Sequence, residues 1–277
     1  MGQLRKIFNR LLGPVFAITV LLTSIFGGYI ITLFSPVLFL NQHRLWRSLM
    51  DRAISFWIIV PMAFLRFLFG VSVKVTGDAI EGGKPAVILM NHRTRLDWMF
   101  LWLAVYKINP WLLTTSKYSL KAQLKMLPGA GFGMAAHHFI FLERNVEEDK
   151  KRLSEAVEYY SKVGGFYQVL IFPEGTDKTK HTTMRSTEYA KKNGFKELSY
   201  LLYPRAAGTA ILITKMRECG YINCVYDVTV GYPDAIVQTE LDLVKGKAPE
   251  CVHFDIRRID ISEVPRTSSE IASWINS

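Results

Sequence analysis

The segment 91–97 contains a histidine and an aspartate that could work as an acid–base pair. His92 and Asp97 are five residues apart, which on a continuous helix would place them about 140° away from a shared face. We therefore expect His92 in a turn directly before a helix and Asp97 in the first or second turn of that helix. The Asp97 carboxylate could then hold one ring nitrogen of His92, while the other nitrogen accepts a proton from a hydroxyl group. A capping asparagine, a surface histidine and a first-turn aspartate would give the same residues.

A protein nucleophile that could accompany this pair is missing from the sequence. There is no Gly-x-Ser-x-Gly motif, and no cysteine directly adjoins a histidine. The pattern therefore favours direct attack by a substrate hydroxyl over a covalent enzyme intermediate. Backbone amides near the pair would stabilise the negative charge that develops on the attacked carbonyl oxygen.

Three further clusters lie next to apolar segments, and the first two could bind a phosphate. In the segment 172–177 (FPEGTD), Gly175 permits a tight turn or a close ligand approach, and Thr176 offers a hydroxyl donor. Arg144 follows another apolar segment and is suited to bidentate phosphate binding. Pro204 and Arg205 form a turn that leads into an apolar helix. A plain turn at 172–177 and an exposed Arg144 without a ligand remain alternatives.

The elements that must position these residues alternate between short β-branched runs and amphipathic stretches. This alternation predicts an α/β fold with a mixed, largely parallel sheet and flanking helices. Catalytic groups in such folds gather at the carboxyl ends of strands, where the segment 91–97 lies. Strands are expected at 71–75, 86–90, 111–115, 139–142, 167–172, 223–230 and 252–259, and helices at 95–106, 147–163, 185–192, 206–216 and 268–276.

The N-terminal part reads as a membrane anchor. No charged residue occurs from Leu11 to His43, and the stretch 14–40 exceeds the roughly 20 residues that span a bilayer. A cleavable signal peptide would have a shorter apolar region. A second stretch, 53–70, is interrupted by Arg66 and could cross, turn back within one leaflet, or lie at the interface. We expect an anchor hairpin at 1–70 and a catalytic domain at 71–277.

The charge and the cysteines narrow the partners further. The formal net charge of +10 indicates an anionic partner, and nucleic-acid-binding motifs are absent, so an anionic lipid or coenzyme is expected. Three cysteines without a CxxC pattern indicate neither a disulfide framework nor a zinc site. The adjacent His137 and His138 are not expected to bind a metal. Basic residues flank both ends of the first apolar stretch, so the hypothesis of a cytosolic catalytic domain rests on the hairpin alone.

The sequence contains four short motifs in this order: Asn-His-x4-Asp, a strand-end Arg, Phe-Pro-Glu-Gly-Thr and Pro-Arg. Their order and spacing resemble the four sequence blocks of the glycerolipid acyltransferase family. This family contains glycerol-3-phosphate and 1-acylglycerol-3-phosphate acyltransferases, and the resemblance covers roughly 71–261. The segments 91–102, 172–177 and 226–233 are most similar to the lysocardiolipin acyltransferase branch. That branch includes enzymes of the endoplasmic reticulum that act on lysophosphatidylinositol, lysophosphatidylglycerol and lysocardiolipin.

The resemblance implies a glycerol-3-phosphate acyltransferase-like fold and a role for each matching residue. His92 would be the base and Asp97 its partner. Acyl-CoA would be a co-substrate, with no cofactor or metal. Pro204 and Arg205 would form part of a substrate wall, although Ala206 and Ala207 stand where relatives often have hydroxyl residues. Arg144, Glu174, Gly175 and Thr176 would surround the acceptor's phosphate. Asn91 and Arg95 would be further substrate-binding residues.

The sequence therefore predicts an acyl-CoA:lysophospholipid acyltransferase in the endoplasmic reticulum membrane. Its acceptor would be lysophosphatidylinositol, lysophosphatidylglycerol, lysocardiolipin or lysophosphatidic acid. An inactive lipid-binding membrane protein and an acyl-CoA thioesterase remain alternatives. Related enzymes commonly carry further hydrophobic segments near the C-terminus, and this chain ends at Ser277 without one, as a short form or a piece of a longer chain would.

Overall fold

A seven-stranded sheet forms the centre of the protein, as seen in a computed structural model that describes residues 2–276. Met1, the first residue of the expected anchor, and Ser277, the last residue of the expected catalytic domain, lie outside this range. Neighbouring strands run parallel in the order β1-β7-β6-β2-β5-β3-β4, except for the antiparallel pair of β6 and β7. This confirms a mixed, largely parallel sheet. The strands are β1 (Ser72–Gly77), β2 (Ala86–Met90), β3 (Ser116–Lys121), β4 (Ile140–Leu142), β5 (Gln168–Ile171), β6 (Cys224–Gly231) and β7 (Cys251–Asp260).

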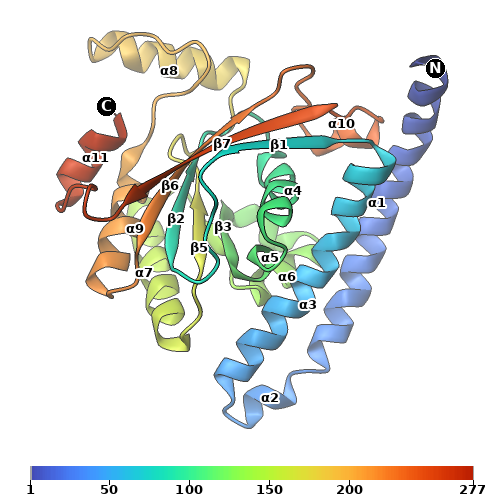
Figure 1. Cartoon of the computed structure of the whole chain (residues 1–277), viewed down its shortest axis with the longest axis horizontal. Helices are drawn as coiled ribbons and strands as arrows, with labels where there is room; N and C mark the ends of the chain where they lie inside the picture. Colours follow the sequence, from blue (N-terminus) through green and yellow to red (C-terminus); the bar gives the residue numbers. More distant parts are fainter. Residues whose placement is uncertain (1, 277) are drawn as a thin grey trace.

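Helices cover both faces of this sheet (Figure 1). On one face, α7, α9 and α11 enclose a core that contains Val157, Ile213 and Ile271. On the other, α4 and the N-terminal helices bury a second core. The helices are α1 (Gly2–Thr32), α2 (Pro36–Phe39), α3 (His43–Ala63), α4 (Asp97–Ile108), α5 (Leu112–Thr115), α6 (Ala130–Ala136), α7 (Val146–Val163), α8 (Lys180–Lys192), α9 (Ala206–Glu218), α10 (Glu240–Val244) and α11 (Ser268–Asn276), with a π-helical turn at Phe64–Leu68 and a 3-10 turn at Ala122–Met126.

Most of the elements lie where the sequence pattern predicts them, but the predicted strand at 111–115 is wrong. Residues Leu112–Thr115 form the helical turn α5, and β3 follows it directly. A short apolar run fits a strand and a buried helical turn equally well. The Asn109 side chain also accepts the backbone N–H of Trp111, which helps to start the turn. Similarly, α8 begins five residues before its predicted start, because Thr179 and Thr182 form a capping box there.

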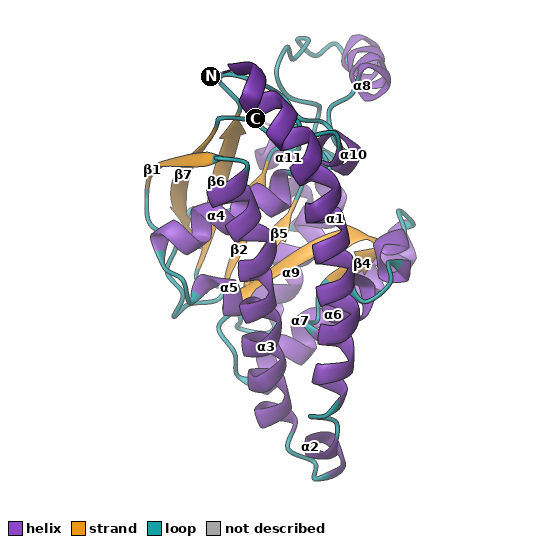
Figure 2. Cartoon of the chain, turned by 90° about the vertical axis from the view of Figure 1, so that its right-hand side faces the viewer, coloured by secondary structure: helices purple, strands orange, loops and turns teal. Residues whose placement is uncertain are grey.

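An antiparallel helical hairpin precedes the sheet, as expected. α1 and α3 lie side by side and are joined by α2 (Figures 1 and 2). The Trp57 indole N–H donates to the Thr23 hydroxyl across the hairpin at 3.1 Å. Pro36 begins α2, and Pro61 lies in the last turn of α3, just before the π-helical turn. The two prolines therefore mark helix ends, where a missing N–H is tolerated best.

Two helical stretches of the described chain are long and apolar enough to cross a membrane. They are Phe8–Phe39, whose 18-residue apolar window has a mean hydropathy of 2.0, and His43–Leu68, whose window has a mean hydropathy of 1.5. Only 17% of the apolar window in the first stretch is buried inside the protein, compared with 44% in the second. Large apolar side chains of α1, such as Leu11, Ile18 and Phe26, are exposed. Such exposure favours association with a membrane, where these side chains would be covered.

The inner face of α3 is held to the sheet by a buried ionic cluster. Asp51 of α3 accepts hydrogen bonds from the Lys117 ammonium at 2.6 Å and from the Arg47 side chain at 2.9 Å. Its other oxygen accepts the Tyr167 hydroxyl at 2.9 Å. Lys117 is fully buried in β3, and this burial lowers its pKa to about 7, against the opposing attraction of Asp51. The fully buried His137 ring lies beside the same carboxylate, whereas His138 stacks on Tyr159.

Asp51→Asn should strongly destabilise the protein. Removing one partner of a buried ion pair leaves uncompensated charge and typically costs about 3–5 kcal/mol of folding free energy. Thermal unfolding of the detergent-solubilised variant measures the loss. The matched control is Glu197→Gln, which breaks an exposed pair with Lys191 and should change the melting temperature little. Equal melting temperatures for the Asp51 variant and the wild type would contradict the role of the cluster.

Candidate active site

Four adjacent parallel strands end around one pocket. β2, β5, β3 and β4 are neighbours in the sheet, and their carboxyl ends lead to His92, Phe172, Lys121 and Arg144. All four side chains line the same cavity, which has a volume of about 270 Å³. This is the edge at which open α/β sheets collect ligands, because successive loops meet there.

His92 and Asp97 meet in the way that their spacing requires. His92 lies in the turn after β2, and Asp97 is the first residue of α4. The His92 Nδ1 atom lies 3.0 Å from Asp97 Oδ2, and the imidazole ring stacks on Phe172 at a centroid distance of 4.0 Å. The carboxylate favours the tautomer with the proton on Nδ1, which leaves Nε2 as the acceptor. Because His92 lines the pocket, a bound hydroxyl group could reach this second nitrogen.

The Asp97 carboxylate is fully buried and accepts three further hydrogen bonds. Oδ2 accepts the backbone N–H of Thr94 at 2.9 Å, in addition to its contact with His92. Oδ1 accepts the Thr94 hydroxyl at 3.0 Å and the Tyr232 hydroxyl at 2.5 Å. Four contacts satisfy the two oxygens and fix the rotation of the carboxylate.

The turn that carries His92 is fastened from two sides. The Asn91 side chain donates to the carbonyl oxygen of Val230 and accepts its N–H, which ties the end of β2 to β6. Glu174 accepts the backbone N–H of His92 at 3.1 Å through one oxygen and that of Leu202 at 3.3 Å through the other. Burial raises the pKa of Glu174 to about 7, although both backbone hydrogen bonds oppose the rise.

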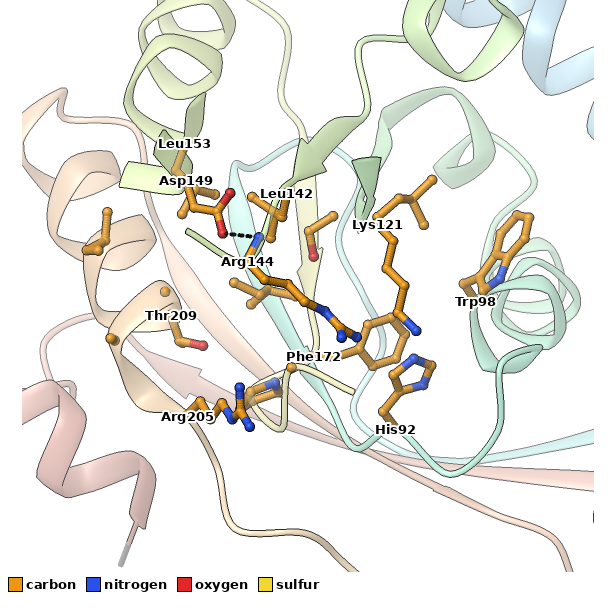
Figure 3. A pocket seen from close by; sticks show the side chains of 18 of the residues that line it. His92, Trp98, Lys121, Leu142, Arg144, Asp149, Leu153, Phe172, Arg205 and Thr209 are labelled. Atoms are coloured by element: carbon orange, nitrogen blue, oxygen red, sulfur yellow. Dashed lines mark hydrogen bonds between the residues drawn. The ribbon is translucent and has the colours of Figure 1, made fainter. Parts of the chain in front are cut away.

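Cationic side chains and apolar walls share the pocket. Figure 3 shows Lys121 and Arg144 extending toward His92 and Phe172, with Arg205 on the opposite side. Burial lowers the pKa of Lys121, with Arg144 and Arg95 adding to the decrease and Asp177 opposing it. An anion in the pocket would offset this mutual repulsion. The apolar part of the lining comes mainly from β3, β4, α7 and α9 and includes Leu120, Leu124, Leu142, Leu153, Ile171 and Ile211.

Arg144 has an unusual backbone conformation. Its φ angle is 66°, in the left-handed region that residues other than glycine seldom adopt. The backbone N–H groups of Glu143 and Arg144 both donate to the Asp149 carboxylate, at 2.7 and 3.0 Å, which holds this conformation. Among the described side chains, those of residues 8–276, none forms an ion pair with the Arg144 guanidinium. A strained residue with a free cation in a pocket indicates a binding role.

Five of the predicted site residues line the pocket, namely His92, Arg95, Arg144, Gly175 and Arg205. Asp97 is buried behind His92. Asn91 and Glu174 are bonded to backbone atoms instead of facing the cavity, and Thr176 and Pro204 are not among its lining residues. Their roles in substrate binding stay predictions.

Three residues at the site escaped the sequence interpretation. Lys121 ends β3, whose position the sequence did not reveal, and Trp98 lies one residue after Asp97 and lines the pocket. Tyr232 lies in the segment 226–233, which resembles the relatives but carried no assigned role. Tyr232 directly follows β6, and β6 pairs with β2, which leads to His92. This position would have indicated a role at the site, but only once the order of the strands is known.

Comparison with known proteins gives the same family as the sequence blocks. The family model described as Acyltransferase matches residues 72–232. Lysophosphatidylinositol acyltransferase 10 from Caenorhabditis elegans is 55% identical over 270 residues, which cover 97% of this chain and 69% of that protein. Lysocardiolipin acyltransferase 1 from Danio rerio is 38% identical over 263 residues, covering 95% and 67%. The mouse 1-acyl-sn-glycerol-3-phosphate acyltransferase epsilon is 26% identical over 257 residues, covering 88% and 69%.

The matched region contains β1 to β6 and every pocket residue except Glu240. Because the family model spans more than half of the chain and the first two relatives align along nearly all of it, the chain belongs to the Acyltransferase family.

Proposed function

We propose that the protein transfers a fatty acyl group from acyl-CoA to the free hydroxyl of an anionic lysophospholipid. The observation that carries this proposal is the His92–Asp97 pair, whose histidine lines a pocket that combines cations with apolar walls. The names of the relatives support lysophosphatidylinositol and lysocardiolipin as acceptors, with lysophosphatidic acid and lysophosphatidylglycerol as further candidates.

In the proposed reaction, His92 Nε2 removes the proton from the acceptor hydroxyl as the hydroxyl oxygen attacks the thioester carbonyl carbon. Asp97 stabilises the imidazolium ion that forms. When the tetrahedral intermediate collapses, the carbon–sulfur bond breaks, and the departing coenzyme thiolate takes up the proton from the imidazolium. The products are the acylated phospholipid and free coenzyme A. No side-chain hydroxyl or thiol of the described residues is hydrogen-bonded to His92, which supports attack without an acyl-enzyme.

The cationic part and the apolar part of the pocket would bind different portions of the substrates. Lys121 and Arg144 would bind the phosphate of the acceptor, because both cations extend toward His92. The apolar side chains between β4, α7 and α9 would cover an acyl chain. We further propose that α1 and α3 hold the catalytic part at the cytosolic face of the endoplasmic reticulum membrane, where both substrates are available.

His92→Ala and Asp97→Asn should each abolish most acyl transfer. Loss of a positioned general base typically lowers the rate by about 10²–10⁴-fold. Labelled acyl transfer in microsomes, normalised to protein level, measures the effect, and His181→Ala on the exposed side of α8 is the control. Near-normal turnover in both variants would exclude the mechanism. Release of free fatty acid without an acceptor, as fast as transfer, would favour the thioesterase alternative.

Arg144→Gln and Lys121→Gln should raise the KM for the lysophospholipid by about tenfold, because each removes a charge-assisted hydrogen bond to phosphate. The KM for acyl-CoA should change less. Lys151→Gln, on the exposed surface of α7, removes the same charge outside the pocket and serves as the control. If only the KM for acyl-CoA rises, the two cations bind the coenzyme instead.

Glu174 would act by fixing the His92 turn, since its carboxylate joins this turn to Leu202. Its folded-state pKa of about 7 lies above the ordinary value of 4.5, so the folded protein binds a proton that the unfolded chain releases between these values. This contribution to stability is complete below pH 4.5 and is lost as the pH rises through 7.

Glu174→Gln removes this titration. The melting temperature of the wild type, relative to the variant, should therefore increase as the pH falls from about 8 to about 5. Thermal unfolding of both proteins across this range tests the expectation. A difference in melting temperature that stays constant with pH, or that decreases, would show that Glu174 does not titrate as its burial indicates.

A further inference from the structure

Tyr232 is joined to the catalytic pair although it does not line the pocket. It follows the last residue of β6, and its hydroxyl lies 2.5 Å from Asp97 Oδ1. The Thr94 hydroxyl donates to the same oxygen at 3.0 Å and lies 3.4 Å from the Tyr232 oxygen. The opposite oxygen, Oδ2, faces His92. The Asp97 carboxylate therefore connects the Tyr232 hydroxyl to the imidazole of His92, which would accept the substrate's proton.

The Tyr232 hydroxyl must be the donor in this contact. Burial raises its pKa well above the ordinary value of 10, and the negative charge of Asp97 raises it further. The phenol therefore keeps its proton throughout the range in which a histidine titrates. The ring is also fixed, because it packs edge-on against Phe100 of α4 with a centroid distance of 6.0 Å.

A donor on Oδ1 has two effects on Oδ2. It holds the carboxylate plane so that Oδ2 points at His92 Nδ1, and it withdraws electron density from the carboxylate. A carboxylate that shares its charge with more donors attracts the neighbouring imidazolium less strongly. The contact with Tyr232 thereby affects how readily His92 can accept the substrate's proton.

We propose that Tyr232 is a positioning residue that tunes the basicity of His92 through Asp97. The inference rests on the proposed function, because it assigns a proton-accepting role to His92. It adds a third residue to the pair, and this residue comes from a strand on the far side of β2 from the phosphate-binding side of the pocket.

Other charged groups around the pair stay the same when Tyr232 changes. They come from the turn after β2, the segment after β5, the ends of β3 and β4, and the starts of α7, α9 and α10. They are Arg93, Arg95, Glu174, Asp177, Lys178, Lys121, Arg144, Asp149, Arg205 and Glu240. A comparison of the wild type with a single Tyr232 variant therefore isolates the hydroxyl.

Tyr232→Phe removes the hydroxyl and keeps the ring. We expect the acid limb of the kcat/KM profile to move up by about half a pH unit to one unit, because the freed carboxylate holds the imidazolium more strongly. At its optimum, the rate should fall by about tenfold or less. The profile is measured with purified protein in mixed micelles that contain lysophosphatidylinositol and labelled acyl-CoA.

Tyr226→Phe is the matched control. Tyr226 is a buried tyrosine within β6, the strand that Tyr232 follows, but its hydroxyl accepts the backbone N–H of Glu81 and does not contact the pair. Its acid limb should coincide with that of the wild type. A Tyr232→Phe profile that also coincides with the wild type would overturn the proposal, and so would a loss of rate without a shift.

Thr94→Val provides a second variant in case Tyr232→Phe folds poorly. It removes the other side-chain donor to Oδ1 and should shift the acid limb in the same direction. An unshifted limb in this variant would likewise overturn the proposal. The result separates the two hypotheses, because full activity of His92→Ala would refute the proposed function, whereas an unshifted limb in an enzyme that depends on His92 refutes only the role of Tyr232.

Discussion

The Asp97 carboxylate is fully buried, and a buried charge is tolerated only when each of its oxygens is satisfied. This requirement organises the site. Thr94 supplies two donors from the turn, Tyr232 supplies one from the end of β6, and His92 completes the set. The turn must adopt one conformation for these contacts to form together. The ring of His92 is thereby fixed at the pocket wall with its second nitrogen free.

The same physical constraint operates at the opposite end of the sheet. Asp51 is buried in α3, and it is satisfied by Lys117 and Arg47 and by a tyrosine hydroxyl. There the buried charge joins the N-terminal hairpin to β3. At the carboxyl ends of the strands, by contrast, the cations of Arg144 and Lys121 face a cavity. The function proposed above would use both features, a hairpin held rigidly to the sheet and a cationic pocket open to an anionic substrate.

The sequence predicted the parts of this arrangement that depend on local pattern. The five-residue spacing placed His92 in a turn and Asp97 at a helix start, and the buried run 86–90 is β2 to the residue. β3 escaped prediction because Ser116, Lys117 and Ser119 have the composition of an exposed segment, yet all three are buried. The burial of the charged Lys117 depends on Asp51, which is 66 residues away in the chain, so no local pattern reveals it.

Glu174 and Asn91 illustrate a second limit. Both side chains have the chemistry of substrate-binding groups, but in the fold they satisfy backbone N–H and C=O groups near His92. Tyr232 shows the reverse, since nothing in its neighbourhood along the chain predicts contact with Asp97. Which polar residue faces the cavity and which supports the turn is decided by strand order, which the sequence pattern alone did not provide.

In the proposed mechanism, His92, held by Asp97, activates the acceptor hydroxyl directly, and no acyl group becomes bound to the protein. Initial-rate kinetics with both substrates varied test this most directly. Direct transfer requires both substrates to be bound together, so double-reciprocal plots at several fixed acceptor concentrations should intersect. Parallel lines would indicate that coenzyme A leaves before the acceptor binds, which contradicts direct transfer.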